Sequence, residues 1–226
     1  MASSRANTSG TLQAVLFDMD GTIVDTEPYW IAAEHALVTE HGGVWTDEHA
    51  HQLVGNALLA SAAYLREHGG VDMEPAAIVD WMLVRVIAAT QEHIPWRPGA
   101  VELLTELRDR AVPCALVTMS YESLATTVIG GLHADSFAAI VTGDQVVDGK
   151  PHPEAYLTAA ARLGVDPTQC VAIEDSPTGI ASARAAGCIV IAVPHTVSVS
   201  PAPGLRIVES LVGLTVDRLA ALLDDA

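Results

Sequence analysis

Positive charge is scarce in this 226-residue chain, which has 11 lysine and arginine residues against 28 aspartates and glutamates and a formal net charge of −17. Nucleic acids and anionic membrane surfaces are bound through basic faces, so the composition argues against both as partners. Lys150 is the only lysine, and the other ten basic residues are arginines. A site for an anionic ligand must therefore draw its positive charge from very few side chains.

Cysteine is also scarce, and long uninterrupted apolar runs are missing. Cys114, Cys170 and Cys188 are far apart and show no Cys-x-x-Cys spacing, so we expect buried, reduced thiols. The polar segment Met1–Gly10 lacks the apolar core of a signal peptide. Every longer apolar stretch contains charges or helix breakers, which argues against a membrane span. The sequence therefore predicts a soluble, cytoplasmic protein.

The first predicted strand, Leu12–Phe17, is followed by a long stretch that has helical periodicity only. Pro28 stands where the first turn of a helix tolerates proline, and no strand pattern occurs before His93. Four helices are expected there: Tyr29–His41, Thr46–Val54, Ala57–His68 and Pro75–His93. An all-helical block is therefore inserted directly after the first strand.

From Gly99 onward, predicted helices and strands alternate. The expected strands are Cys114–Thr118, Ala138–Thr142, Cys170–Glu174 and Ile189–Val193, with a short apolar piece at Leu205–Val208. This alternation predicts right-handed crossovers and a parallel sheet. We expect an α/β fold with a Rossmann-like parallel sheet core, residues 1–26 and 94–226, and an inserted all-helical cap domain, residues 27–93.

Polar side chains stand at the carboxyl ends of several predicted strands. The first strand runs into Asp18 and Asp20, which taken alone are more typical of a turn than of a site. Later strands are followed by Thr118 and Ser120, by a loop that contains Lys150, and by Glu174-Asp175-Ser176. Ligands bind at this edge of a parallel sheet, so we expect these groups to converge. Carboxylates suit Mg²⁺, and hydroxyl and ammonium donors suit phosphoryl oxygens.

Four short motifs together resemble the haloacid dehalogenase-like superfamily. They are Phe-Asp-Met-Asp-Gly-Thr at 17–22, Thr118 after an apolar run, Gly-Lys-Pro-x-Pro at 149–153 and Ile-Glu-Asp-Ser at 173–176. Each motif alone is a weak signal, but their order and spacing resemble the superfamily from Leu12 onward. The helical insert resembles that of the subfamily with an α-helical cap, in the phosphatase and β-phosphoglucomutase-like branch.

The resemblance implies phosphoryl transfer on two aspartates. Asp18 would attack phosphorus in line and form an aspartyl-phosphate. Asp20 would protonate the leaving oxygen and then deprotonate the attacking water. Mg²⁺ would be held by the Asp18 carboxylate, the Asp20 backbone carbonyl and Asp175, with Glu174 nearby as a direct or water-mediated ligand.

The resemblance also implies which residues would hold the substrate's phosphoryl group. Thr118 and Lys150 would bind its oxygens, and Ser120 and Ser176 are further candidates. Ser176 is equally well explained as the N-cap of a helix that begins near Thr178.

The helical insert would act as a lid that excludes water and contacts the leaving group, with hinges near Asp25–Pro28 and Ile94–Pro98. Asn56 and Arg85 are candidate specificity residues in it. Arg85 lies mid-helix among apolar neighbours and could face the site. The competing interpretation is an exposed side chain whose stem lies along apolar surface.

The implied function is Mg²⁺-dependent hydrolysis of a small phosphorylated metabolite, by default a sugar phosphate. The sharpest rival is a sugar phosphomutase similar to β-phosphoglucomutase, although such mutases carry His and Arg where this chain has Trp30 and Leu58. Asp20 argues against carbon–halogen chemistry, because true haloacid dehalogenases lack that second aspartate. A non-catalytic ligand-binding relative is the third interpretation, and a monomer is the default oligomeric state.

Overall fold

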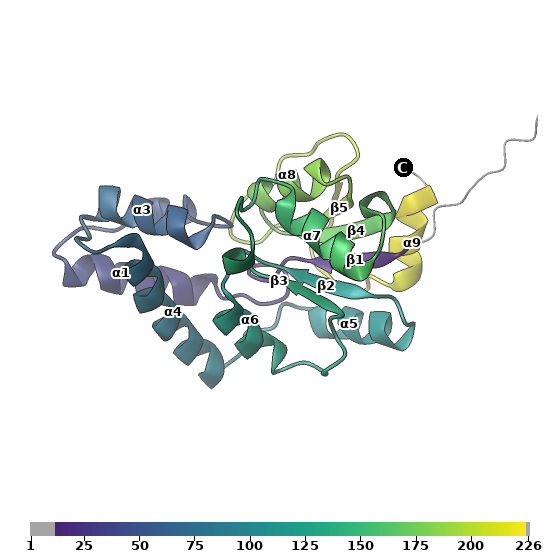
Figure 1. The fold of residues 1–226 in the computed structure, drawn as a ribbon, viewed down its shortest axis with the longest axis horizontal. Coiled ribbons are helices and arrows are strands. Elements are labelled where there is room, and N and C mark those ends of the chain that lie inside the picture. Colours follow the sequence, from purple (N-terminus) through teal and green to yellow (C-terminus); the bar gives the residue numbers. More distant parts are fainter. Residues whose placement is uncertain (1–11, 225–226) are drawn as a thin grey trace, which may run out of the picture.

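A parallel six-stranded sheet forms the centre of the fold (Figure 1). The computed structural model describes residues 12–224. The strands are β1 (Ala14–Phe17), β2 (Cys114–Val117), β3 (Ala139–Val141), β4 (Cys170–Glu174), β5 (Ile189–Ala192) and β6 (Arg206–Ile207). Their order is β3-β2-β1-β4-β5-β6, and each neighbouring pair is parallel. The predicted α/β class with a Rossmann-like core is confirmed.

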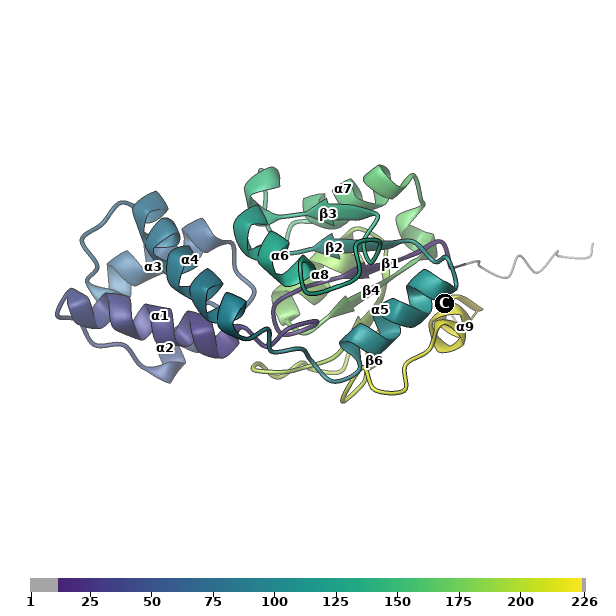
Figure 2. The same cartoon turned by 90° about the horizontal axis from the view of Figure 1, so that it is seen from below.

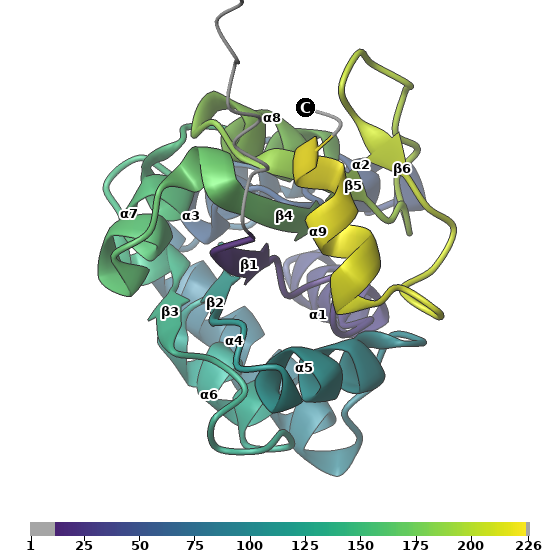
Figure 3. The ribbon, with the colours of Figure 1, turned by 90° about the vertical axis from the view of Figure 1, so that its right-hand side faces the viewer.

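The central strand β1 is buried on both faces, because its alternate side chains enter two different cores. Val15 and Phe17 pack in the core of helices α5 (Ala100–Asp109) and α9 (Val216–Asp224), to which α6 (Glu122–Ile129) also contributes. Ala14 and Leu16 pack in the core of α7 (Glu154–Leu163) and α8 (Pro177–Ala185). Figure 3 shows these helices on the two sides of the sheet. The same alternation decides where polar side chains beyond the strand ends point.

Four helices form a separate group beside the carboxyl end of the sheet (Figure 2). They are α1 (Glu27–Glu40), α2 (Asp47–His51), α3 (Leu58–Gly69) and α4 (Pro75–Glu92). Helix α4 contacts α1 and α3, and it also contacts α6. The remaining helical elements are two 3₁₀ turns, η1 (Gly143–Gln145) and η2 (Pro167–Gln169).

Helix α2 ends three residues before the predicted boundary at Val54, because the chain turns there toward the sheet. Gly55 follows in a left-handed conformation (φ +76°), and a Cβ atom on it would lie 2.8 Å from Ser176 Oγ. A longer side chain and a continued helix are both incompatible with this close approach. The tertiary contact therefore overrides the helical pattern.

The three cysteines are buried and free, as predicted. Burial raises the pKa of Cys114 and Cys188 to about 12. Within residues 12–224, no helix has the length and apolar character needed to cross a membrane. The polar segment Met1–Gly10 lies outside the described residues.

The two connections between the helical group and the sheet run side by side. The amide of Asp25 donates to Pro95 O at 2.8 Å, and the amide of Arg97 donates to Ile23 O at 2.8 Å. His195, in the segment after β5, joins both: its Nε2 lies 2.8 Å from Asp25 Oδ1, and its Nδ1 lies 2.7 Å from an Arg97 guanidinium nitrogen. His195 thus contacts both predicted hinges.

Replacing this histidine should loosen both connections without unfolding the sheet. We expect His195→Ala to increase hydrogen exchange at the Asp25 and Arg97 amides by about tenfold, because a hydrogen bond to a charged group contributes about 1.5 kcal/mol. His133→Ala is the control, since His133 is exposed and its nearest acid, Asp135, lies 3.9 Å away. Equal exchange in both variants would show that His195 does not restrain the connections. Exchange is measured by mass spectrometry.

Candidate active site

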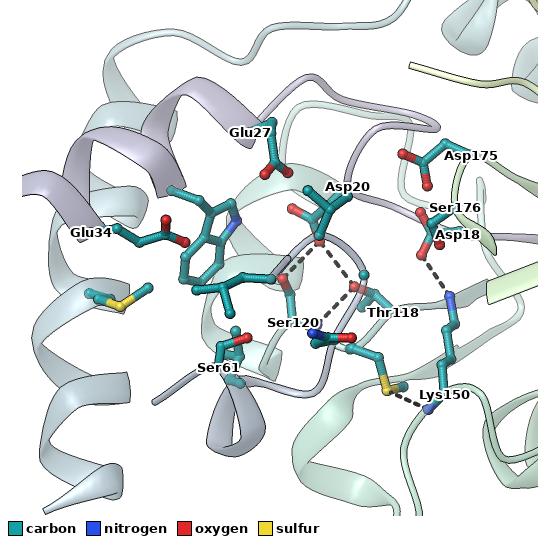
Figure 4. Close-up of a pocket in the computed structure, with 18 residues that line it drawn as sticks. Asp18, Asp20, Glu27, Glu34, Ser61, Thr118, Ser120, Lys150, Asp175 and Ser176 are labelled. Atoms are coloured by element: carbon teal, nitrogen blue, oxygen red, sulfur yellow. Dashed lines mark hydrogen bonds and ion pairs between the residues drawn. The ribbon is translucent and has the colours of Figure 1, made fainter. Parts of the chain in front are cut away.

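A cavity of about 60 Å³ lies between the carboxyl end of the sheet and the helical group (Figure 4). Eight residues singled out from the sequence line it: Asp18, Asp20, Asn56, Thr118, Ser120, Lys150, Asp175 and Ser176. Helix α1 adds Glu27, Trp30 and Glu34, and α3 adds Leu58 and Ser61. Strand ends and helices far apart in the sequence therefore enclose one site.

Lys150 lies at the base of this cavity, where it pairs with two carboxylates. Its Nζ lies 2.7 Å from Asp18 Oδ1 and 2.6 Å from Glu174 Oε1, and it donates to Val117 O at 2.9 Å. Burial lowers the pKa of Lys150, but the two carboxylates outweigh this and leave its pKa raised. The only lysine of the chain is therefore a permanent buried cation that holds one oxygen of Asp18.

Glu174 lies beside Asp18 on the same face of the sheet, and helices α7 and α8 confine it. Phe17 pairs with Ile173, so Asp18 and Glu174 follow side by side on neighbouring strands, on the face that carries α7 and α8. Tyr156 on α7 donates to Glu174 Oε1 at 2.7 Å. A Cβ atom on Gly179 would lie 1.9 Å from the same carboxylate, so α8 also confines it. Glu174 does not line the cavity, and its contacts position Lys150.

Asp20 is held by three hydroxyl groups. Thr26 Oγ1 donates to Asp20 Oδ1, while Thr118 Oγ1 and Ser120 Oγ donate to Oδ2 at 3.2 and 2.8 Å. Two of these hydroxyls, on Thr118 and Ser120, were expected to face a phosphoryl group. In the structure they also orient the carboxyl group of Asp20, which was not anticipated.

Ser176 is the N-cap of helix α8, as one of its two interpretations predicted. Its Oγ accepts from the Gly179 amide at 3.1 Å at the start of α8, and it lies 3.4 Å from Glu174 Oε2. The residue also lines the cavity. Capping fixes the start of the helix directly beside Asp175.

Of the two candidate specificity residues in the helical insert, Asn56 lines the cavity and Arg85 does not. Asn56 lines the cavity, and its amide nitrogen donates to Gln52 O at 2.7 Å. Arg85 was a candidate site residue, but it does not line the cavity, and its side chain is exposed, as the competing interpretation expected. Its guanidinium lies 3.3 Å from the centre of the Trp81 ring, one turn earlier on α4, and 3.7 Å from Glu40. A cation over an aromatic face stays solvated while its stem covers apolar surface, which favours the exposed position.

Glu27 and Glu34 on α1 are cavity residues that the sequence reasoning missed. They are seven residues apart, so they lie on one face of the helix. Burial raises the pKa of Glu27 to about 7, with Asp20 and Asp25 adding to the effect. Burial also raises the pKa of Glu34 to about 8, opposed by a 3.0 Å hydrogen bond from Trp45 Nε1. The available signal was two acids at heptad spacing in an apolar helix.

Comparisons with known proteins agree with this arrangement. The model of the haloacid dehalogenase-like hydrolase family matches residues 12–187. The chain belongs to this family. Hexitol phosphatase A of Escherichia coli (strain K12) is 37% identical over 181 residues, which cover 79% of this chain and 81% of that protein.

Two solved structures share the fold over nearly their whole length. CbbY from Rhodobacter sphaeroides, in complex with xylulose-(1,5)-bisphosphate, is 27% identical with a TM-score of 0.82, covering 92% of this chain and 99% of that one. The β-phosphoglucomutase from Clostridium difficile has a TM-score of 0.84 and covers 95% of this chain and 98% of that one. Its 23% identity shows the common fold alone.

Members of the haloacid dehalogenase-like family generally use Mg²⁺, and the buried acids of this chain fit such a cation. Carboxylate oxygens of Asp18, Glu174 and Asp175 lie within 4.8 Å of one another. Asp18 Oδ2 is buried without a hydrogen-bond partner. Burial, followed by the charges of Asp18 and Glu174, raises the pKa of Asp175 well above its usual range. A Cβ atom on Gly21 would lie 2.0 Å from Asp175 Oδ2, so glycine keeps this oxygen accessible. These are the hard oxygen ligands that suit Mg²⁺.

Metal binding should appear as a change in how stability depends on pH. Asp18, Glu27, Glu34 and Asp175 have raised pKa values in the folded chain, so the folded metal-free state binds more protons than the unfolded state. With EDTA, the free energy of unfolding should therefore decrease from about pH 4 to pH 8. At pH 8, Mg²⁺ at 100 times its Kd should restore about 2.7 kcal/mol.

The measurement is thermal unfolding at several pH values with EDTA or Mg²⁺. Asp175→Asn should remove most of the increase in Tm that Mg²⁺ causes, whereas Asp135→Asn, which changes an exposed acid, should leave it intact. A wild-type Tm that does not respond to Mg²⁺ at pH 8 would contradict a metal site at these acids.

Proposed function

We propose that this chain is a Mg²⁺-dependent phosphomonoester hydrolase that acts through an aspartyl-phosphate on Asp18. The observation that carries the proposal is the asymmetric carboxylate of Asp18. Lys150 fixes Oδ1 at 2.7 Å, while Oδ2 is buried beside the cavity without a partner. A carboxylate held in one orientation with one free oxygen is suited to in-line attack on phosphorus. Membership of the hydrolase family and the phosphatase relatives support the same class of reaction.

The two steps use Asp18 and Asp20 in turn. Asp18 Oδ2 attacks phosphorus, and the ester oxygen leaves with a proton from Asp20, which gives the free alcohol and an aspartyl-phosphate. Asp20 then takes a proton from a water molecule that attacks phosphorus, and the Asp18 carboxylate leaves as inorganic phosphate is released. The three hydroxyls that contact Asp20 keep its carboxyl group in one position for both proton transfers.

The phosphoryl oxygens would be held by Lys150, Thr118 and Ser120. Asp18, Asp175 and the Asp20 backbone carbonyl would hold Mg²⁺, with Glu174 nearby. When bound, this cation offsets the repulsion between the anionic nucleophile and the anionic ester. Lys150, paired with Asp18 and Glu174, supplies a fixed positive charge for the same purpose.

The helical cap, residues 27–93, would close over the substrate and open to release product. The cavity of about 60 Å³ is much smaller than the roughly 300–1,000 Å³ of ordinary small-molecule sites. Substrate entry therefore requires the cap to move relative to the core. The paired connections held by His195 would be the pivot for this motion.

A sugar phosphomutase is the weaker interpretation. A mutase intermediate carries a phosphoryl group at each end, so both ends of its site need positive charge. Trp30 and Leu58, at the two corresponding cap positions, line the cavity and are apolar. Among the described residues that line the cavity, Lys150 is the one basic side chain, and it lies at the core end. Hydrolysis with water as acceptor fits this arrangement.

The nucleophile is tested by Asp18→Asn. We expect it to lower Mg²⁺-dependent release of phosphate from p-nitrophenyl phosphate by about 10⁴-fold or more, because an amide cannot form the aspartyl-phosphate. Asp20→Asn should lower it by about 10²–10⁴-fold through loss of proton transfer. The exposed variant Asp135→Asn is the control and should retain wild-type activity.

Substantial phosphatase activity in Asp18→Asn would contradict the assigned nucleophile. Interconversion of sugar phosphates without release of inorganic phosphate by the wild type would favour the mutase instead.

A further inference from the structure

Among the described residues that line the cap side of the cavity there are carboxyl groups and a hydroxyl but no basic side chain. Glu27, Glu34 and Ser61 line it together with the apolar side chains of Trp30 and Met82. In Figure 4 the carboxyl groups of Glu27 and Glu34 turn toward the space that also contains Asp20. Groups that can donate and accept hydrogen bonds thus lie beside an aromatic and a thioether surface.

The charge balance of the cavity is strongly asymmetric. Of its lining residues, Asp18, Asp20, Glu27, Glu34 and Asp175 are acids, and Lys150 is the single base. Lys150 is paired with Asp18 and Glu174 at the core end. Mg²⁺ would likewise bind at the core end, at Asp18 and Asp175. The two acids on α1 are therefore without a cation to share with a ligand.

We propose that the cap side is a specificity surface for an uncharged polyhydroxy leaving group, and that it rejects esters with a second anionic group. This inference rests on the proposed phosphatase function and names the class of ester. The carboxyl groups of Glu27 and Glu34 bind substrate hydroxyls, while Trp30 contacts the C–H face of the carbon chain. A second phosphate or a carboxylate would be desolvated there beside acids, without a counter-charge.

The position of Glu34 is fixed independently of any ligand. Its side chain is buried, at 3% exposure, and Trp45 Nε1 donates to Oε2 at 3.0 Å. Its raised pKa, about 8, lets it act as donor or acceptor near neutral pH, which suits a hydroxyl, and it supplies no positive charge for an anion. A preorganised buried group of this kind discriminates between ligands more strongly than apolar surface does.

The structure of the Rhodobacter sphaeroides protein holds xylulose-(1,5)-bisphosphate, an ester with a second phosphate. For the present chain, the inference predicts that such an ester is a poor substrate. A shared fold therefore does not imply a shared leaving group.

The first test compares two esters that differ at one carbon. Sorbitol 6-phosphate ends in a hydroxymethyl group and 6-phosphogluconate ends in a carboxylate, with the same hydroxylated chain between. We expect wild-type kcat/KM to be at least about 100-fold higher for sorbitol 6-phosphate. Values within about threefold of each other would overturn the inference.

The second test changes the surface itself. Glu27→Lys adds a cation at a half-buried position and should raise kcat/KM for 6-phosphogluconate relative to sorbitol 6-phosphate by at least about tenfold. Glu40→Lys makes the same charge change on the outer part of α1, beside Arg85, and should leave the ratio unchanged. An equal change of the ratio in both variants would overturn the inference, because only net charge would then matter.

Glu34→Leu keeps the approximate volume and removes both oxygens. It should lower kcat/KM for sorbitol 6-phosphate about tenfold relative to p-nitrophenyl phosphate, mainly through KM. Equal losses of kcat/KM for the two esters would assign Glu34 a structural role and would overturn the claim that it binds substrate hydroxyls. Circular dichroism and Tm establish that each variant is folded, and the wild-type comparison does not depend on any variant.

Failure of this inference and failure of the proposed function are separate outcomes. A wild type that cleaves p-nitrophenyl phosphate but does not discriminate between the matched esters overturns the inference alone. A wild type that releases no phosphate from any of these esters with Mg²⁺ overturns the proposed function, and the inference with it.

Discussion

The contact on which the site depends is the buried ion pair network of Lys150 with Asp18 and Glu174. Parallel pairing of β1 with β4 places the two carboxylates side by side on one face of the sheet. Burying either acid without a counter-charge is strongly unfavourable, and removing one partner of such a pair typically costs about 3–5 kcal/mol. Lys150 is therefore required by the fold as much as by the chemistry. Its two contacts also leave Asp18 with a single free oxygen.

A second set of contacts surrounds this network and controls its geometry. Tyr156 and the close approach of Gly179 confine Glu174 from α7 and α8, while three hydroxyls confine Asp20 from the loop and β2. The core end of the cavity is consequently rigid. The cap end is formed by helices that reach the core through two paired connections. The Lys150 network and the helices that cover the cavity thus belong to different parts of the chain.

The distribution of charge links this architecture to function. Within the part of the chain that the structure describes, the one basic side chain lining the cavity lies at the core end, where a phosphoryl group would bind, and the cap end carries Glu27 and Glu34. The amino-acid composition alone does not reveal this uneven distribution of charge, because the whole chain is acidic. What distinguishes the cap end of the cavity is that burial raises the pKa of Glu27 and of Glu34, whereas most acids elsewhere are exposed.

The sequence by itself determined the α/β fold, the helical insert and the convergence of Asp18, Asp20, Thr118, Lys150 and Asp175, because strand patterns and the residues at strand ends are local signals. Only the tertiary structure decided which way those residues point. Contacts with Lys150 and Tyr156 hold Glu174 beside Asp18 but outside the cavity lining. Stacking on Trp81 keeps Arg85 outside the cavity, and one face of α1 adds Glu27 and Glu34 to it. These outcomes depend on packing between distant segments, and no local pattern encodes such packing.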